Sequence, residues 1–205
     1  MHYRDILGIA ATVIALISYV PYFRDIFARK TKPHAFTWLI WGVLTVIAFV
    51  GQLYGHAGPG AWVTGFTAFV CLAIAAIAAM NGERNIVQLD WIALAGAGVA
   101  LLIWYLTRGP LLSVILITVI DNLGFVPTLR KSYHRPFEET LSTFVLSGIK
   151  WMLGIFALDH LSVTTALFPL SIVVASWLFV VMLLVRRAQL GRAHATVTLL
   201  GSECG

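Results

Sequence analysis

TVIALISYVPYFR, residues 12–24, decides the fold of this chain. This run is apolar up to Pro21. A basic segment with a second proline, Pro33, follows it and leads into another apolar run. TVIDNLGFVPTLR, residues 118–130, repeats it with six identities in thirteen positions, and a similar basic segment, proline and apolar run follow. The chain therefore contains two copies of one structural unit.

The composition predicts a membrane protein. Of 205 residues, 60% are hydrophobic and 11% are charged, whereas a soluble domain carries about 25% charged residues. Seven apolar runs are close to the roughly 20 residues that a helix needs to cross a bilayer, and none alternates like a barrel strand. We expect an all-α, polytopic membrane protein with transmembrane helices near 6–23, 35–54, 61–80, 91–106, 110–129, 141–158 and 161–185.

The repeat predicts how these helices are grouped. Each copy supplies three helices, and because three is odd, one extra helix is needed for the second triplet to enter the membrane in the same direction as the first. We expect a 3+1+3 order, with two parallel triple-helix bundles. The predicted parts are a first bundle at 6–80, a linker helix at 90–107, a second bundle at 110–186 and a cytoplasmic tail at 187–205.

The positive charges predict the orientation. The formal net charge is +5, and with seven spans only Arg4 and Arg108 fall on one side of the membrane. The opposite side receives Arg24, Arg29, Lys30, Lys32, Arg84, Arg130, Lys131, Arg135, Arg186, Arg187 and Arg192. The positive-inside rule then places the N-terminus outside and the C-terminus in the cytoplasm, in the plasma (inner) membrane. The basic residues thus indicate orientation, and we expect no nucleic-acid partner.

This layout, with a proline near the cytoplasmic end of the first helix of each triplet, resembles the PQ-loop superfamily and, within it, the SWEET transporters. The resemblance implies alternating access between two bundles for a small polar metabolite, a sugar or another small solute, with the third helix of each triplet packed between the first two. Where the family has Pro-Gln, this chain has Pro21-Tyr22 and Pro127-Thr128. A non-transporting PQ-loop-type membrane receptor or ligand-binding protein is the alternative.

The two repeated prolines are predicted hinges. A proline inside a helix cannot donate to the carbonyl four residues earlier and clashes with it, so Pro21 and Pro127 are each expected to bend their helix. Either the bends are simply tolerated by the bundle, or the helix ends swing as an inner gate. Tyr19 and Phe125, two residues before the prolines, are the predicted constriction.

Polar residues inside the spans predict the binding site. Asp121 lies fifteen residues before Pro136 and Lys150 fourteen after it, so both are expected at one depth and could form an ion pair. That pair would be either a structural bridge or part of a wet central cavity. Asn122 points about 100° away from Asp121. The predicted substrate-binding residues are Asp121, Asn122, Lys150, Trp151, Thr67, Ser171 and Trp177.

Other classes of function find no support in the sequence. Cys71 is inside a span and Cys204 is in the tail, which argues against a disulfide framework or a metal site. No nucleotide-binding motif or catalytic grouping is evident, so we expect neither an enzyme nor a cofactor. Transport would be passive or proton-coupled. The expected partners are a small polar solute and the lipid bilayer, and homo-oligomer formation stays open.

Overall fold

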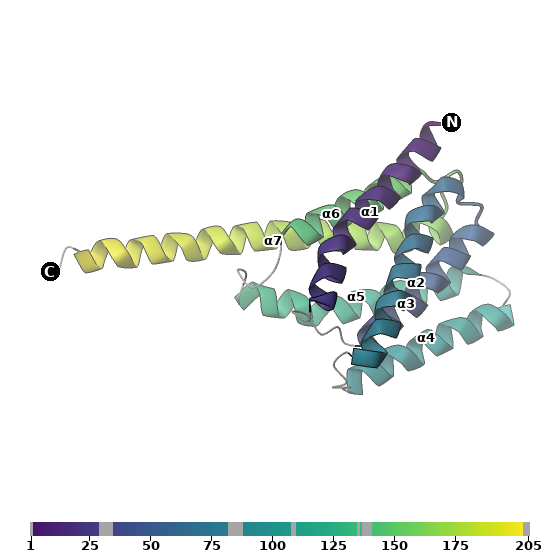
Figure 1. Ribbon diagram of the computed structural model, residues 1–205, viewed down its shortest axis with the longest axis horizontal. Coiled ribbons are helices and arrows are strands. Elements are labelled where there is room, and N and C mark those ends of the chain that lie inside the picture. The colour runs from purple at the N-terminus through teal and green to yellow at the C-terminus, as the bar shows by residue number, and fades with distance from the viewer. Residues whose placement is uncertain are drawn as a thin grey trace.

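The computed structural model describes residues 2–28, 35–81, 88–107, 110–134, 136 and 141–202. These residues form only helices, as predicted, and no strand occurs among them. The elements are α1 (Tyr3–Phe27), α2 (Ala35–Tyr54), a 3-10 turn η1 (Gly58–Ala61), α3 (Trp62–Asn81), α4 (Gln88–Thr107), α5 (Pro110–His134), α6 (Leu141–Phe156) and α7 (Val163–Ser202) (Figure 1). Each predicted apolar run corresponds to one α-helix.

Side-chain hydrogen bonds fix two helix starts. At α1, the Asp5 carboxylate accepts a hydrogen bond from the backbone N–H of His2 at 2.8 Å. At α7, Ser162 Oγ accepts from the backbone N–H of Thr165 at 3.2 Å, and Thr165 Oγ1 accepts from the Ser162 N–H at 3.0 Å. These bonds satisfy amide groups near the first turn, where a helix leaves donors without partners.

Three helices pack together in each half of the chain. α3 lies against both α1 and α2, and α7 lies against both α5 and α6. Within the described residues, α1 shares no substantial contact with α2, and α5 shares none with α6. The third helix of each triplet therefore lies between the other two.

The contacts between the halves follow the same repeat. α1 packs on α6 and α2 packs on α5, while α3 touches α6 and α2 touches α7. These contacts occur in equivalent pairs. The α1–α6 contact corresponds to the α5–α2 contact, and the α3–α6 contact corresponds to the α7–α2 contact. α4 lies outside this pattern, against α5 and α2 (Figure 1).

Glycines allow close approach where α6 meets the turn before α3. A Cβ on Gly60 would lie 2.6 Å from the backbone oxygen of Gly154, and a Cβ on Gly154 would lie 2.6 Å from Val63 Cγ1. Both distances are shorter than real Cβ contacts, so only glycine fits without a shift. The main core cluster beside it includes Ala11, Ala15, Leu44, Val63, Ile117, Trp151 and Phe168.

A glutamine from α2 supplies a hydrogen bond that a proline in α7 cannot make. Pro169 lies inside α7 and lacks the N–H that would bond to the Thr165 carbonyl. Gln52 Nε2 donates to that carbonyl at 2.9 Å, from a side chain that is 1% exposed. The side chain thus replaces a missing helical hydrogen bond and joins the two halves.

α7 is longer than predicted, because the helix does not end near residue 185. It contains 40 residues, which at 1.5 Å per residue is about 60 Å, and its C-terminal part projects beyond the other helices (Figure 1). Most of the expected tail, 187–205, therefore continues α7 as far as Ser202. Where α7 leaves the bundle, Arg186 Nε donates to the Tyr133 carbonyl at 3.0 Å, and Arg187 donates to the Pro136 carbonyl at 3.0 and 2.9 Å.

Among the residues that the structure describes, three helices are long and apolar enough to cross a membrane. Their candidate spans are Tyr3–Arg24, Gly58–Met80 and Val163–Leu190. Shorter apolar stretches occur at Trp38–Tyr54, Pro110–Leu123 and Leu141–Phe156. These lengths fit a membrane protein, and seven complete crossings stay a prediction.

Candidate functional site

A buried lysine meets a tyrosine between the two halves of the chain. Lys150 on α6 is 4% exposed, and its Nζ lies 3.5 Å from the hydroxyl of Tyr19 on α1. The same Nζ is 4.6 Å from the centre of the Tyr19 ring and 5.7 Å from that of Trp151. Ring faces attract a cation, so the two aromatic rings stabilise the ammonium in part.

Helix α3 adds a polar stripe beside this contact. Thr64, Thr67 and Cys71 are spaced by three and four residues, so they share one face of the helix. The Tyr19 hydroxyl lies near Thr67 and Cys71, but beyond hydrogen-bond distance of the Thr67 hydroxyl. Thr64 and Thr67 are buried, and neither Oγ1 has a hydrogen-bond partner within the described part of the chain. We call Tyr19, Thr64, Thr67, Cys71, Lys150 and Trp151 the Lys150 cluster.

The possible ion pair between Asp121 and Lys150 is not formed. Among the described residues the Asp121 carboxylate has no cationic partner within 4.0 Å, and Lys150 contacts Tyr19 instead. Equal depth on consecutive helices is insufficient for a contact here, because α7 lies between α5 and α6.

Asp121 and Asn122 have different surroundings, as their 100° separation predicts. The Asp121 side chain is half-buried and makes no ion pair among the described residues. Asn122 Nδ2 donates to the Thr118 carbonyl of its own helix at 2.7 Å and lines a groove between α5 and α7. This open groove has a volume of about 520 Å³, and its walls are mainly apolar, with Ser171 and Phe125 among the lining residues.

The remaining predicted binding residues are divided between packing and the Lys150 cluster. Ser171 Oγ donates to the Phe168 carbonyl of its own helix at 2.8 Å. Trp177 packs on Gly148, where a Cβ would lie 2.8 Å from its Nε1. Trp151 is 3% exposed, with its ring edge-on to Phe168 at 6.0 Å. Thr67 and Trp151 thus lie with Lys150, whereas Ser171 and Trp177 lie on the α7 side.

The predicted hinge and gate residues also lie apart. α1 continues through Pro21, and Pro127 lies within α5, although its side chain is outside the described part. Tyr19 packs with the cluster around Val70 and Ile74. Phe125 contacts Phe144 at 6.0 Å and Phe179 at 5.1 Å. No ring contact between Tyr19 and Phe125 is seen in the described residues.

The end of the bundle that holds the N-terminus is closed by polar contacts. Arg4 Nη1 lies 3.2 Å from Asp159 Oδ1 and 3.1 Å from the Asp159 carbonyl. The Asp159 N–H donates to the Ala57 carbonyl at 2.9 Å. Gly58 beside it has φ of +60°, and a Cβ there would overlap the Asp159 carboxylate. These contacts connect α1, the α2–α3 turn and the α6–α7 turn.

Two contacts between the halves of the chain were not predicted from the sequence: Tyr19 with Lys150, and Gln52 with the carbonyl that Pro169 leaves without a donor. Tyr19 lies fourteen residues before Pro33, as Lys150 lies fourteen after Pro136, so equal depth in the two copies was a usable signal. Gln52 and Pro169 carried a second signal, an amide and a proline inside apolar helices. Pairing them requires knowledge of which helices touch.

No protein-family model matches this chain, and searches of curated proteins and of solved structures found no match either.

Proposed function

We propose that this protein is a membrane transporter with seven spans in a 3+1+3 order, which moves a small polar solute by alternating access between two triple-helix bundles. The observation that carries the proposal is the contact between Tyr19 and Lys150. It places a buried ammonium between α1 of the first bundle and α6 of the second. Ionisable groups inside membrane proteins are costly and typically mark pathways.

The helix contacts support motion of one bundle against the other. Each triplet packs through its own third helix, and the same pairs of helices recur between the triplets. In two-bundle transporters of this kind, alternating access is largely rigid-body rocking around a central site. The Lys150 cluster lies at such an interface, and Pro21 lies two residues from Tyr19.

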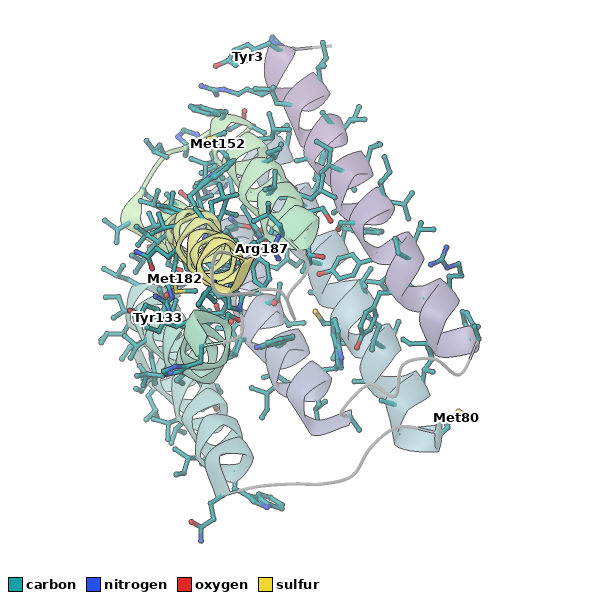
Figure 2. All side chains as sticks on the ribbon, turned by 90° about the vertical axis from the view of Figure 1, so that its left-hand side faces the viewer. Tyr3, Met80, Tyr133, Met152, Met182 and Arg187 are labelled. Carbon is teal, nitrogen blue, oxygen red and sulfur yellow. The ribbon has the colours of Figure 1, made fainter. Side chains whose placement is uncertain are left out.

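The orientation follows from the predicted topology. In the predicted orientation, the Arg4–Asp159 contact lies at the outer end and the Arg186 and Arg187 contacts lie at the inner end. Tyr3 and Met80 lie at opposite ends of the bundle (Figure 2). This arrangement supports an N-terminus outside and a C-terminus in the cytoplasm. The resemblance to PQ-loop transporters implies the same orientation.

Counterflow in liposomes tests the proposal. The purified protein is reconstituted, and exchange of labelled sugars, amino acids, nucleosides and short-chain carboxylates is measured for the native form, Lys150→Met and Asp121→Asn. Ser142→Ala, at an exposed position on α6, is the control. We expect the native form and the control to exchange at least one solute, and Lys150→Met to lose it.

Binding without exchange would instead assign the chain to the receptor class. Exchange that is unchanged in Lys150→Met and Asp121→Asn would place the transport site outside the Lys150 cluster.

A further inference from the structure

We propose that the Lys150 cluster binds the carboxylate of a small monoanionic solute; this inference rests on the proposed transport function. The first step is the coordination of the ammonium. A lysine carries three N–H donors, and the only polar partner of Lys150 among the described residues is the Tyr19 hydroxyl at 3.5 Å. A hydroxyl does not neutralise the charge, so the ammonium retains donors and an uncompensated positive charge.

The second step is the behaviour of the threonines. Thr12, Thr45 and Thr118 each donate to the carbonyl four residues earlier, at 2.7 to 2.8 Å. This is the usual way for a threonine inside a helix to satisfy its hydroxyl. Thr64 and Thr67 are buried and do not do so. Their hydroxyls are therefore available to another acceptor on the stripe that faces Tyr19.

The third step is the choice of ligand. Hydroxyl and ammonium donors suit an oxyanion, and hydrogen bonds to charged groups are the strong ones. Lys150 is the one cation of the cluster, so the cluster balances a single negative charge on the ligand. Trp151 and Phe168 form an apolar wall next to Lys150. A short organic acid with one carboxylate fits this set better than a phosphate or a neutral sugar.

The test compares L-lactate with D-glucose as labelled probes in counterflow. We expect native protein to exchange lactate in preference to glucose. Loss of a hydrogen bond to a charged group corresponds to about 10- to 100-fold in affinity. We therefore expect Lys150→Met to reduce lactate exchange by about that factor, Lys150→Arg to retain most of it, and Ser142→Ala to match the native form.

A binding measurement separates failure of this inference from failure of the proposed function. Lactate, glucose and sodium chloride are each added to detergent-purified protein, and the change in Tm is measured. We expect lactate to raise the Tm of the native protein and of Ser142→Ala, and to leave that of Lys150→Met unchanged. Tyr19→Phe, which keeps the ring, should retain a smaller shift.

The outcomes are distinct. Exchange of glucose but not of lactate would overturn carboxylate binding by the Lys150 cluster and would still support a transport function. A lactate-dependent Tm shift without exchange of any solute would support the anion-binding site and would overturn the proposed transport function. Equal shifts with chloride, or no shift and no lactate exchange, overturn the inference.

Discussion

Lys150 places a cation in an interface that is otherwise built from apolar and hydroxyl side chains. Moving an ion out of water costs several kcal/mol after relaxation, and only a well-placed counter-ion offsets that cost. Here two aromatic rings and one hydroxyl replace the counter-ion. The residue is therefore expected to weaken the fold in exchange for a binding group.

Replacement of Lys150 by methionine tests this balance. Methionine has a similar length without the charge, so we expect Lys150→Met to raise the free energy of unfolding by about 1–4 kcal/mol. Chemical denaturation in detergent, followed by tryptophan fluorescence, measures the change. A marked loss of stability would mean that the ammonium already has good partners in the folded protein.

Gln52 provides a second residue-scale prediction. Gln52→Leu removes the donor to the Thr165 carbonyl and should destabilise the protein by about 1–3 kcal/mol, the cost of an unpaired buried acceptor. Pro169→Ala restores a helical N–H for that carbonyl, so the double variant should recover most of the loss. Thermal unfolding of the four proteins in this cycle gives the coupling. Additive effects would show that Gln52 and Pro169 act independently.

At the scale of elements, two glycines determine how closely α6 approaches the turn before α3. Gly60→Ala would push a methyl group against the Gly154 carbonyl and the Leu158 side chain. Because the nearest Gly154 atom belongs to the backbone, it cannot rotate away. We expect a loss of about 1–3 kcal/mol in stability.

Gly98 in α4 is the matched control, since no atom of the described residues lies within 4 Å of a Cβ added there. Alanine is the better helix former, so Gly98→Ala should be stabilising by about 0.5–1 kcal/mol. Unfolding midpoints of both variants, measured in one detergent, decide the comparison. Similar changes at the two positions would rule out the close approach as the cause.

The repeat dominates the molecule as a whole, yet its two halves differ in chemistry. In the alignment, Phe125 corresponds to Tyr19, and Ile47 corresponds to Lys150, since each lies ten residues after its threonine, Thr37 or Thr140. Ile47 is buried in the apolar core. The polar contact thus exists on one side of the interface only, which argues for a specific role and against a general packing requirement.

Labelling of introduced cysteines tests the proposed topology. Leu161 and Met80 are 73% and 79% exposed, and the first lies in the α6–α7 turn and the second near the end of α3. In a background with Cys204 replaced by serine, an impermeant maleimide should label Leu161→Cys in intact cells, and Met80→Cys only after permeabilisation. The opposite pattern would reverse the orientation.

Periodicity and composition predicted the helices well, because a long apolar run leaves few alternatives. α2 has the predicted bounds, 35–54, whereas α7 exceeds its predicted end because residues 186–202 contain no proline that would end the helix. Lys150 was found because a charge inside an apolar run is conspicuous. Its contact with Tyr19 was not predicted. Matching depth was enough to suggest an ion pair with Asp121, whereas the contact with Tyr19 depends on which helices pack against each other.

The bond from the Asp159 N–H to the Ala57 carbonyl has a consequence for mutational tolerance. Both atoms belong to the backbone, so exchange of either side chain leaves the donor and the acceptor in place, and only proline at position 159 removes the N–H. The link between Gln52 and the Thr165 carbonyl, in contrast, depends on a single side chain and is lost when the residue at position 52 cannot donate to that carbonyl. Random mutagenesis should therefore remove the Gln52 link by substitutions at one position of α2, whereas the bond between the turns should survive most substitutions at positions 57 and 159.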